Sequence, residues 1–208
     1  MNILIFGSNG TVGKQLLLQA LAQGYNVRAF VRDAGKLADL QHNKLEVFTG
    51  DVFSLDAVTS SMKNIDAVLC ALGDGRIGRV RAEGTKNIIK AMQQQQVSRL
   101  ICQTTLGCGD SRDTLNFFWK HIMFGWFLKK AFLDHELQER YVFESDLDWT
   151  IVRPGAFTKG KFTGMYHHGF DGSTKGLALK ISPADVASFM LKQLSSKQYL
   201  HKCPGLSY

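Results

Sequence analysis

Residues 1–13, MNILIFGSNGTVG, decide the fold of this chain. They join an apolar strand, Asn2–Phe6, to three glycines in the spacing Gly7-x-x-Gly10-x-x-Gly13, and a helical pattern follows at once. In this spacing the first glycine allows a tight turn, the second lets a ligand approach the backbone, and the third permits close packing of the helix on the strand. Backbone N–H groups at the positive end of the helix can then hold a diphosphate. The segment predicts dinucleotide binding by Gly7, Ser8, Asn9, Gly10, Thr11, Val12 and Gly13.

Short apolar runs alternate with helical patterns along the rest of the chain. Each run is nearly continuous in apolar residues, as expected for strands that are covered on both faces. Parallel strands need a crossover helix, so the alternation predicts an α/β fold: a single Rossmann-type domain over residues 1–208 with a doubly wound parallel sheet and helices on both faces. The predicted strands are Asn2–Phe6, Asn26–Val31, Leu45–Thr49, Ala67–Ala71, Arg99–Gln103 and Trp149–Val152. The predicted helices are Thr11–Gln23, Ala34–Leu40, Leu55–Met62, Val80–Gln95 and Thr114–Ser145.

Local signals mark some of these boundaries. Gly24 follows the first helix, where a left-handed cap is needed. Ser182, with proline next and an acid at the third helical position, predicts a final helix that runs to about Ser196. Residues 155–181 are rich in glycine and aromatic residues, which indicates irregular structure with room for one more strand.

The end of the second strand predicts which dinucleotide is bound. An NAD enzyme usually places Asp or Glu there to hold the adenine-ribose 2′-hydroxyl. Here Arg32 follows the strand, and Lys36 lies one helical turn further on. A cation at this place would bind a 2′-phosphate, and Asp33 is more simply the cap of the next helix. The predicted cofactor is therefore NADP(H).

The residues that follow the third and fourth strands extend the predicted cofactor site. Asp51 could accept a hydrogen bond from the adenine amino group, or it could be an ordinary turn acid, and both interpretations stay open. Val52 follows it directly. At Leu72 and Gly73, after the fourth strand, the small glycine would let the backbone pass near the ribose.

Composition narrows the class of partner. Hydrophobic residues make up 45% of the chain and charged residues 21%, which is an ordinary balance for a globular protein. The formal net charge of +7 suggests an anionic partner: nucleic acid, an anionic membrane surface or a phosphorylated small molecule. Nucleic acid is the poorest of these, because basic residues are not interleaved with stacking aromatics.

The cysteines and histidines do not indicate a metal site. The four cysteines form no C-x-x-C pair, and Cys70 and Cys102 end apolar runs as reduced core thiols would. No third ligand is spaced to join His167-His168 or Asp134-His135. We expect the first pair to be exposed and the second to lie on the surface of a long helix. With no signal-peptide pattern at the first residues, a reducing cytoplasmic setting is expected.

A set of motifs carries a resemblance to a known family: Gly7–Gly13, Val31-Arg32-Asp33, Gly50-Asp51-Val52, Glu83–Ile88, Thr104-Thr105, Arg153-Pro154, Tyr166 with Asp171-Gly172, and Tyr208. With these motifs the chain resembles an atypical short-chain dehydrogenase/reductase, of the biliverdin-IXβ reductase/flavin reductase type within the wider NmrA-like set. The resemblance covers nearly the whole chain and implies an NAD(P)-binding reductase. The motifs are specific for the superfamily and less specific for the activity.

The usual acid/base machinery of this superfamily is absent. Standard members use Tyr-x-x-x-Lys, whereas here Tyr141 is followed four positions later by Ser145 and Tyr166 by Phe170. A flavin or a linear tetrapyrrole can take hydride at a conjugated position and a proton from solvent, so a reductase of either needs little dedicated acid. The resemblance implies that Thr105 orients nicotinamide and substrate; the alternative is that Thr104 and Thr105 only satisfy loop backbone.

The chain departs from the biliverdin-reducing type after Pro154. The members of that type carry a histidine there, whereas this chain has Gly155. We expect Gly155 to open the pocket and Arg153 to be its nearby polar group. Residues 105–135 and 153–181 would form the substrate pocket, and Thr104, Arg153, Pro154 and Gly155 complete the predicted cofactor contacts.

Two charged or aromatic segments remain open to interpretation. The basic cluster Arg76–Arg81 could attract substrate phosphate or propionate groups, or it could be a solvated helix start. Residues 117–130 carry many aromatics with Lys120, His121, Lys129 and Lys130 at helical spacing. They fit an amphipathic helix on the sheet better than one on a membrane surface. No apolar run is long enough to span a bilayer.

The sequence therefore favours an NADPH-dependent reductase that passes hydride to a flavin or to a biliverdin-like tetrapyrrole, acting as a monomer or weak homo-oligomer. A rival hypothesis is an NmrA-like redox sensor that binds NADP(H) without turning it over. A third is a membrane-surface assembly factor that uses the 117–130 helix.

Overall fold

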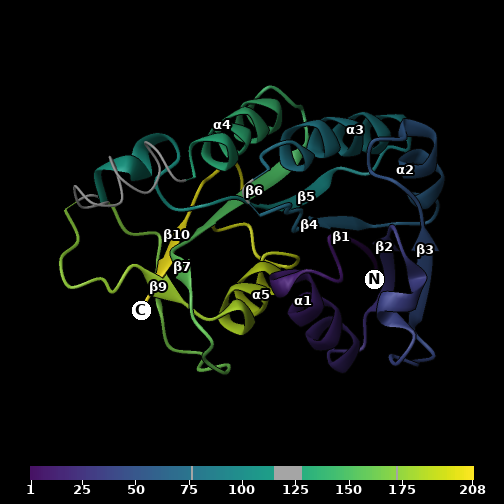
Figure 1. Ribbon diagram of the computed structural model, residues 1–208, viewed down its shortest axis with the longest axis horizontal. Coiled ribbons are helices and arrows are strands. Elements are labelled where there is room, and N and C mark those ends of the chain that lie inside the picture. Colours follow the sequence, from purple (N-terminus) through teal and green to yellow (C-terminus); the bar gives the residue numbers. More distant parts are fainter. Residues whose placement is uncertain (76, 115–127, 172) are drawn as a thin grey trace.

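The computed structural model describes residues 1–75, 77–114, 128–171 and 173–208. Among these residues the main sheet has the strand order β3-β2-β1-β4-β5-β6-β10-β8, and β7 pairs with β9 in a separate ribbon (Figure 1). All pairs of the main sheet are parallel except β10 with β8. The predicted doubly wound α/β fold is confirmed. The strands are β1 (Asn2–Phe6), β2 (Asn26–Val31), β3 (Leu45–Thr49), β4 (Ala67–Cys70), β5 (Arg99–Gln103), β6 (Asp148–Pro154), β7 (Ala156–Phe157), β8 (His167–His168), β9 (Lys180–Ile181) and β10 (Gly205–Ser207).

Helices cover both faces of the sheet, as crossover connections require. One face carries α1 (Thr11–Ala22) and α5 (Pro183–Lys192), and the other carries α2 (Leu55–Ser61), α3 (Val80–Gln94) and α4 (Lys129–Phe143) (Figure 1). Two short 3₁₀ helices, η1 (Ala34–Leu37) and η2 (Gly109–Thr114), lie in connections. None of the helices in the described ranges is both long and apolar enough to cross a membrane.

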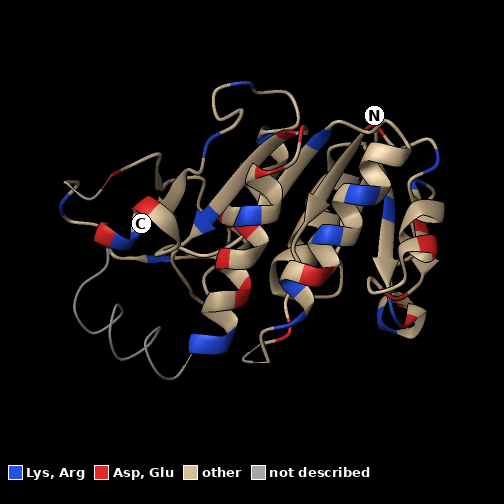
Figure 2. Ribbon diagram, turned by 90° about the horizontal axis from the view of Figure 1, so that it is seen from above, with Lys and Arg blue, Asp and Glu red and all other residues tan. Residues whose placement is uncertain are grey.

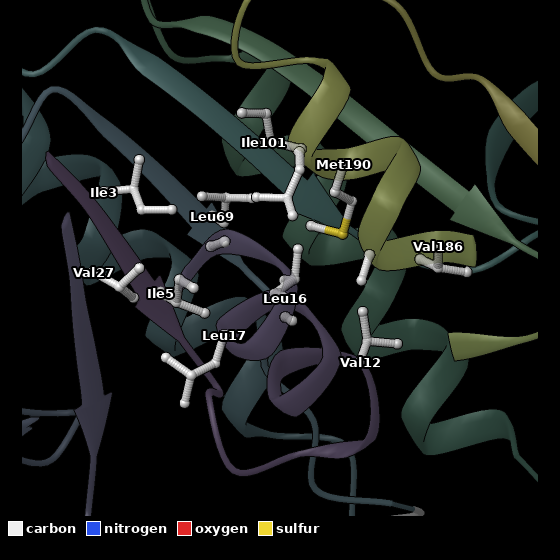
Figure 3. Packing of buried hydrophobic residues seen from close by; sticks show 14 of the residues in the cluster. Ile3, Ile5, Val12, Leu16, Leu17, Val27, Leu69, Ile101, Val186 and Met190 are labelled. Atoms are coloured by element: carbon white, nitrogen blue, oxygen red, sulfur yellow. The ribbon is translucent and has the colours of Figure 1, made fainter. Parts of the chain in front are cut away.

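The alternation of side chains along each strand divides the core into two layers. Ile3 and Ile5 of β1 pack with Leu16 of α1 and Met190 of α5 on one face (Figure 3). Leu4 and Phe6 of β1 pack on the opposite face with side chains from α2, α3 and α4. Because both faces are buried, the strands are apolar at successive positions, which explains the near-continuous runs in the sequence.

The predicted caps are confirmed, and three helix boundaries are not. Gly24 has a left-handed backbone with φ 83°, and the Ser182 hydroxyl accepts from the Asp185 amide at the start of α5. However, α5 ends at Lys192 rather than near Ser196, and the segment after β2 is the short η1 instead of a helix to Leu40. The helix predicted from Thr114 begins at Lys129 in the structure; the part of that prediction on residues 115–127 lies outside the described residues.

Residues 155–181, where the sequence left room for one more strand, contain the short strands β7, β8 and β9, and β10 follows at the end of the chain. β10 extends the sheet beside β6, and β8 pairs with it in the antiparallel direction. The glycine- and aromatic-rich stretch after β6 also supplies β7 and β9. These strands have two or three residues each, which is too short for a period-2 pattern to be read.

Candidate functional site

A cavity of about 670 Å³ lies over the carboxyl ends of the central strands. The strand order reverses at β1, which pairs with β2 on one side and β4 on the other. Open α/β sheets bind ligands at such a switch point, because the connections leave in opposite directions there. The lining contains every predicted site residue except Ser8, Gly13, Lys36 and Arg153: Gly7, Asn9, Gly10, Thr11, Val12, Arg32, Asp51, Val52, Leu72, Gly73, Thr104, Thr105, Pro154 and Gly155.

Two glycines of the turn, Gly7 and Gly13, are held by backbone contacts that leave no room for a side chain. Gly7 has φ +78°, and a Cβ there would lie 2.3 Å from the Ala71 carbonyl oxygen. A Cβ on Gly13 would lie 1.9 Å from the carbonyl oxygen of Gly7. Gly13 therefore shapes the turn from behind, as predicted for the third glycine, and does not reach the cavity.

Ser8 also supports the turn from within the protein. Its side chain is fully buried, and its hydroxyl donates to the Ile5 carbonyl at 2.8 Å. The Ser8 side chain therefore ties the turn to β1 and does not line the cavity.

The start of α1 offers backbone donors to the cavity. Gly10, the N-cap, makes no side-chain cap, whereas Ser54 and Ser182 cap α2 and α5. The first N–H groups of a helix need acceptors, and an anion can supply them. An uncapped helix that begins beside the glycine turn fits the diphosphate of a dinucleotide.

Arg32, the first residue after β2, is exposed and lines the cavity. Asp33 accepts from the Gly35 amide at 2.9 Å and caps η1, as predicted. Lys36 lies within η1 but outside the cavity wall. Asp51 lines the cavity while it also accepts from the Phe53 amide at 3.0 Å, so the two interpretations of its role are compatible. Of the two predicted cations, Arg32 is therefore the one that lines the cavity.

The two threonines after β5 differ in their contacts. Thr104 is buried and donates its hydroxyl to Glu139 Oε1 at 2.7 Å. Thr105 is half-buried, and its hydroxyl makes one long contact of 3.4 Å to the neighbouring Leu106 carbonyl. Thr105 is thus the threonine with a hydroxyl to offer a ligand.

Arg153 is not the polar group of the pocket, and that expectation is corrected. Its guanidinium is buried with an exposed fraction of 2% and donates to both carboxylate oxygens of Glu139, at 2.9 and 2.7 Å. It also forms an ion pair with Asp110 of η2. Burial works against the charge, but the contact with Glu139 outweighs it and raises the pKa of Arg153. Arg153 joins β6, α4 and the loop after Thr105.

Gly155 does border the cavity, but its small size serves the backbone. A Cβ there would lie 2.6 Å from the carbonyl of Leu179. Leu179 directly precedes β9, and β9 pairs with β7, the strand that begins just after Gly155. The glycine therefore permits the β7–β9 ribbon to close against β6.

The prediction of a surface pair at Asp134-His135 is wrong, because both side chains are buried. Asp134 accepts from the amides of Arg81 and Ala82 at 3.1 and 3.0 Å, so it caps α3 from the neighbouring helix. Asp74 caps the same end through the Val80 amide at 3.2 Å and pairs with the Arg81 guanidinium at 2.6 Å. The donors at the start of α3, unlike those of α1, are satisfied by the protein.

The two arginines of the basic cluster that the structure describes, Arg79 and Arg81, differ in their surroundings. Arg81 is buried between its two carboxylates, whereas Arg79 is exposed, lines the cavity and lies over the Phe53 ring at 5.1 Å. Arg76 lies outside the described residues. Lys and Arg are interspersed with Asp and Glu over the helices in Figure 2. His167 and His168 are exposed, as expected, and the described residues contain no group of His, Cys, Asp or Glu that could hold a metal.

His135 is a cavity residue that the sequence analysis assigned to the surface. It is buried, with an exposed fraction of 9%, yet it contributes to the wall of the same cavity as Thr105. Burial, and then the positive charge of Arg81, lower the pKa of His135 to about 3. The missed signal is spacing: His135, Gln138 and Glu139 share one helix face at i, i+3 and i+4, and all three are buried.

Comparison with known proteins agrees with this geometry. A family model described as NAD(P)H-binding matches residues 7–197. The chain is 25% identical to the photosystem II assembly factor Ycf39 of Synechocystis over 77% of its length, and 26% identical to the TIC 62 protein of Pisum sativum over 99%. It spans only 46% and 41% of those two proteins. It is 28% identical to the uncharacterized YwnB of Bacillus subtilis, covering 96% of this chain and 94% of that one.

Solved structures share the whole fold. The anaerobilin reductase ChuY of Escherichia coli O157:H7 superposes with a TM-score of 0.84 at 26% identity, covering 99% of this chain and 96% of that one. A short-chain dehydrogenase/reductase of Veillonella parvula, solved in complex with NADP, has a TM-score of 0.82 over 100% of this chain and 94% of that one. At 14% identity the second likeness shows the fold alone.

Proposed function

The chain belongs to the NAD(P)H-binding family, and from that premise we propose that it is an NADPH-dependent reductase that passes hydride to a flavin or a biliverdin-like tetrapyrrole. The observation that carries the proposal is the cavity, which continues from the glycine turn past Thr105 to an apolar wall. A largely apolar hollow with a few polar groups is the usual form of a small-molecule site.

NADPH rather than NADH is supported by charge. Arg32 lies at the cavity edge after β2, and no ion pair within the described part of the chain occupies its guanidinium. A guanidinium binds phosphate through paired, charge-assisted hydrogen bonds. The carboxylate next to it, Asp33, is turned to the Gly35 amide. The 2′-phosphate would therefore meet a cation whose neighbouring acid is already engaged.

The chain's own residues would bind and orient the reactants. When bound, NADPH supplies a hydride, and the acceptor takes its accompanying proton from water. The uncapped start of α1 would hold the diphosphate, and the Thr105 hydroxyl would orient the reacting end. Placing two reactants correctly can supply much of the rate of a hydride transfer that needs no protein acid.

A flat, conjugated acceptor fits the rest of the wall. Its residues are mostly apolar or aromatic: Ile77, Leu106, Leu128, Ala156, Phe157 and Leu179. The 26% identity with a reductase of anaerobilin, a tetrapyrrole, across nearly both whole chains supports this class of acceptor.

The second candidate is an NADP(H)-binding protein that does not turn the nucleotide over. The chain has no Tyr-x-x-x-Lys pair, and one relative is named as an assembly factor. The aromatic 117–127 stretch on which a membrane-surface role depends lies outside the described residues. Binding without oxidation would favour this candidate.

The test is a steady-state assay of NADPH oxidation with FMN, FAD, riboflavin and biliverdin as acceptors. We expect turnover with at least one acceptor and a slower rate with NADH. In Thr105→Val the loss of one hydrogen bond should lower kcat by about tenfold while leaving the Kd for NADP⁺ nearly unchanged. Tight NADPH binding without oxidation by any of these acceptors would overturn the proposed reductase.

A further inference from the structure

Gln138 links His135 to a buried polar cluster beneath the cavity. Its Oε1 lies 3.2 Å from His135 Nδ1. Its Nε2 donates to Thr85 Oγ1 at 3.0 Å and to Cys102 Sγ at 3.2 Å. Gln138 and Thr85 have no exposed surface. Because the amide nitrogen is directed at these two acceptors, its oxygen is the atom left for the histidine.

This orientation decides which imidazole nitrogen carries the proton. An amide oxygen can only accept, so His135 Nδ1 must donate to it. In a neutral imidazole the other nitrogen, Nε2, then has a lone pair and no proton. No described residue bonds to His135 Nε2, although the residue borders the cavity.

Burial is the main cause of the lowered pKa of His135, and the charges around the ring do not reverse it. Arg81 of α3 also lowers the pKa of His135, and Asp74, from the loop after β4, is the counterion of Arg81. Asp134 on the same helix is engaged by the start of α3, and Glu139 by Arg153. On the side of the sheet, Gln138 contacts the buried thiols of Cys70, at the end of β4, and Cys102 of β5. None of these groups offers the ring an unpaired carboxylate.

We propose that Gln138 is a positioning residue that fixes His135 as the Nδ1–H tautomer, so that Nε2 presents a hydrogen-bond acceptor to the cavity. The ligand group it recognises is an N–H or O–H donor. The acceptor's ring N–H groups and the cofactor's amide and hydroxyl groups share this chemistry. The choice of ligand rests on the proposed function, but the tautomer does not.

The tautomer can be measured directly by long-range ¹H–¹⁵N NMR of the full chain with labelled histidine, assigned with His135→Gln. We expect the Nδ1–H pattern for His135, unchanged between pH 8 and about pH 5, below the ordinary histidine pKa of about 6.5. Addition of NADP⁺ alone, and then of a flavin or biliverdin, should shift the Nε2 resonance at one of the two steps. That step identifies the source of the donor.

Variants of Gln138 separate positioning from packing. Gln138→Glu places a carboxylate against Nδ1, so His135 should titrate near or above its ordinary pKa, and affinity for the ligand should fall severalfold at neutral pH and recover at higher pH. Gln138→Met removes the acceptor and should give mixed tautomers. Gln193→Met is the matched control, since the Gln193 side chain is also buried but donates to the Phe189 carbonyl at the end of α5, away from His135.

The inference and the proposed reductase fail separately. An Nε2–H tautomer, ordinary titration, or no Nε2 shift with either ligand would overturn the inference even if NADPH is oxidised. The expected tautomer with a shift on NADP⁺ but no oxidation of NADPH would uphold it while removing the reductase.

Discussion

Breaking the Glu139–Arg153 pair should cost more stability than any comparable surface change. Both side chains are almost completely buried, with exposed fractions of 3% and 2%. Glu139→Leu leaves the Arg153 guanidinium buried with only the exposed Asp110 as its charged partner. An uncompensated buried charge costs about 3–5 kcal/mol. In a chain of this length each kcal/mol lowers Tm by about 2–4 °C, so the midpoint should fall by about 6–20 °C.

The assay is thermal unfolding followed by circular dichroism, with Glu46→Leu as the control. Glu46 also pairs with an arginine, Arg28, at 2.7 Å, but it is 58% exposed. A pair of that kind is worth about 0–1 kcal/mol, so the control should move by no more than about 4 °C. The double variant Glu139→Leu/Arg153→Met removes both charges and should be more stable than Glu139→Leu alone. Equal losses in Glu139→Leu and Glu46→Leu, or additive losses in the double variant, would refute this reasoning.

Three further outcomes follow from the site. Arg32→Ala should raise the Kd for NADPH about 10- to 100-fold and leave that for NADH unchanged, because a charge-assisted hydrogen bond contributes about 1.5–3 kcal/mol. Lys36→Ala, the control outside the cavity, should change neither in a fluorescence titration. In Gly10→Ala the added Cβ would lie 3.1 Å from the nearest protein atom, a distance that a small shift can accommodate, so we expect this variant to fold. It should bind NADPH weakly, because the Cβ would stand where the ligand approaches the backbone. Gly13→Ala should fail in both circular dichroism and binding, since its Cβ would lie 1.9 Å from a carbonyl oxygen. Finally, His135 has a folded pKa of about 3, so the unfolded chain binds the extra proton between that pH and about 6.5. The free energy of unfolding should therefore fall as pH drops through this window, by about 1.4 kcal/mol per pH unit more than it does in His135→Gln. Urea titrations at several pH values would measure this difference. Parallel pH profiles of the two proteins would contradict a buried neutral imidazole.

The glycine turn and the alternation of strands and helices were predictable because their causes are local. Gly7, Gly10 and Gly13 carry the turn's steric demands in their own spacing, and β1 to β5 lie within two residues of their predicted ends. Buried parallel strands need continuous apolar runs, so the pattern and the fold have the same cause. Most of the cavity lining was predictable for the same reason, because these residues follow the carboxyl ends of the predicted strands.

The polar cluster beneath the cavity was not predictable, because its partners are distant in the sequence. Arg153 was expected in the pocket, yet its partner Glu139 comes from a neighbouring helix, and the pair closes only when α4 packs on the sheet. Asp134 caps a helix that begins 54 residues earlier, at Val80. In a single sequence such residues look like ordinary surface charges, because the helical pattern indicates which face of a helix is buried but not which element packs against it.

The β7–β9 ribbon forms one side of the cavity and is held there by few backbone hydrogen bonds. Ala156, Phe157 and Leu179 form part of the wall, but the ribbon is joined by few bonds, among them Ala156 N–H to the Leu179 carbonyl at 2.8 Å and Thr158 N–H to the Ile181 carbonyl at 3.0 Å. Such a ribbon can detach while the eight-stranded sheet stays intact, since small units open at lower free energy than the whole protein. Amide exchange at Ala156 and Thr158 therefore reports the breathing of this wall, whereas exchange in β1 and β4 reports global unfolding.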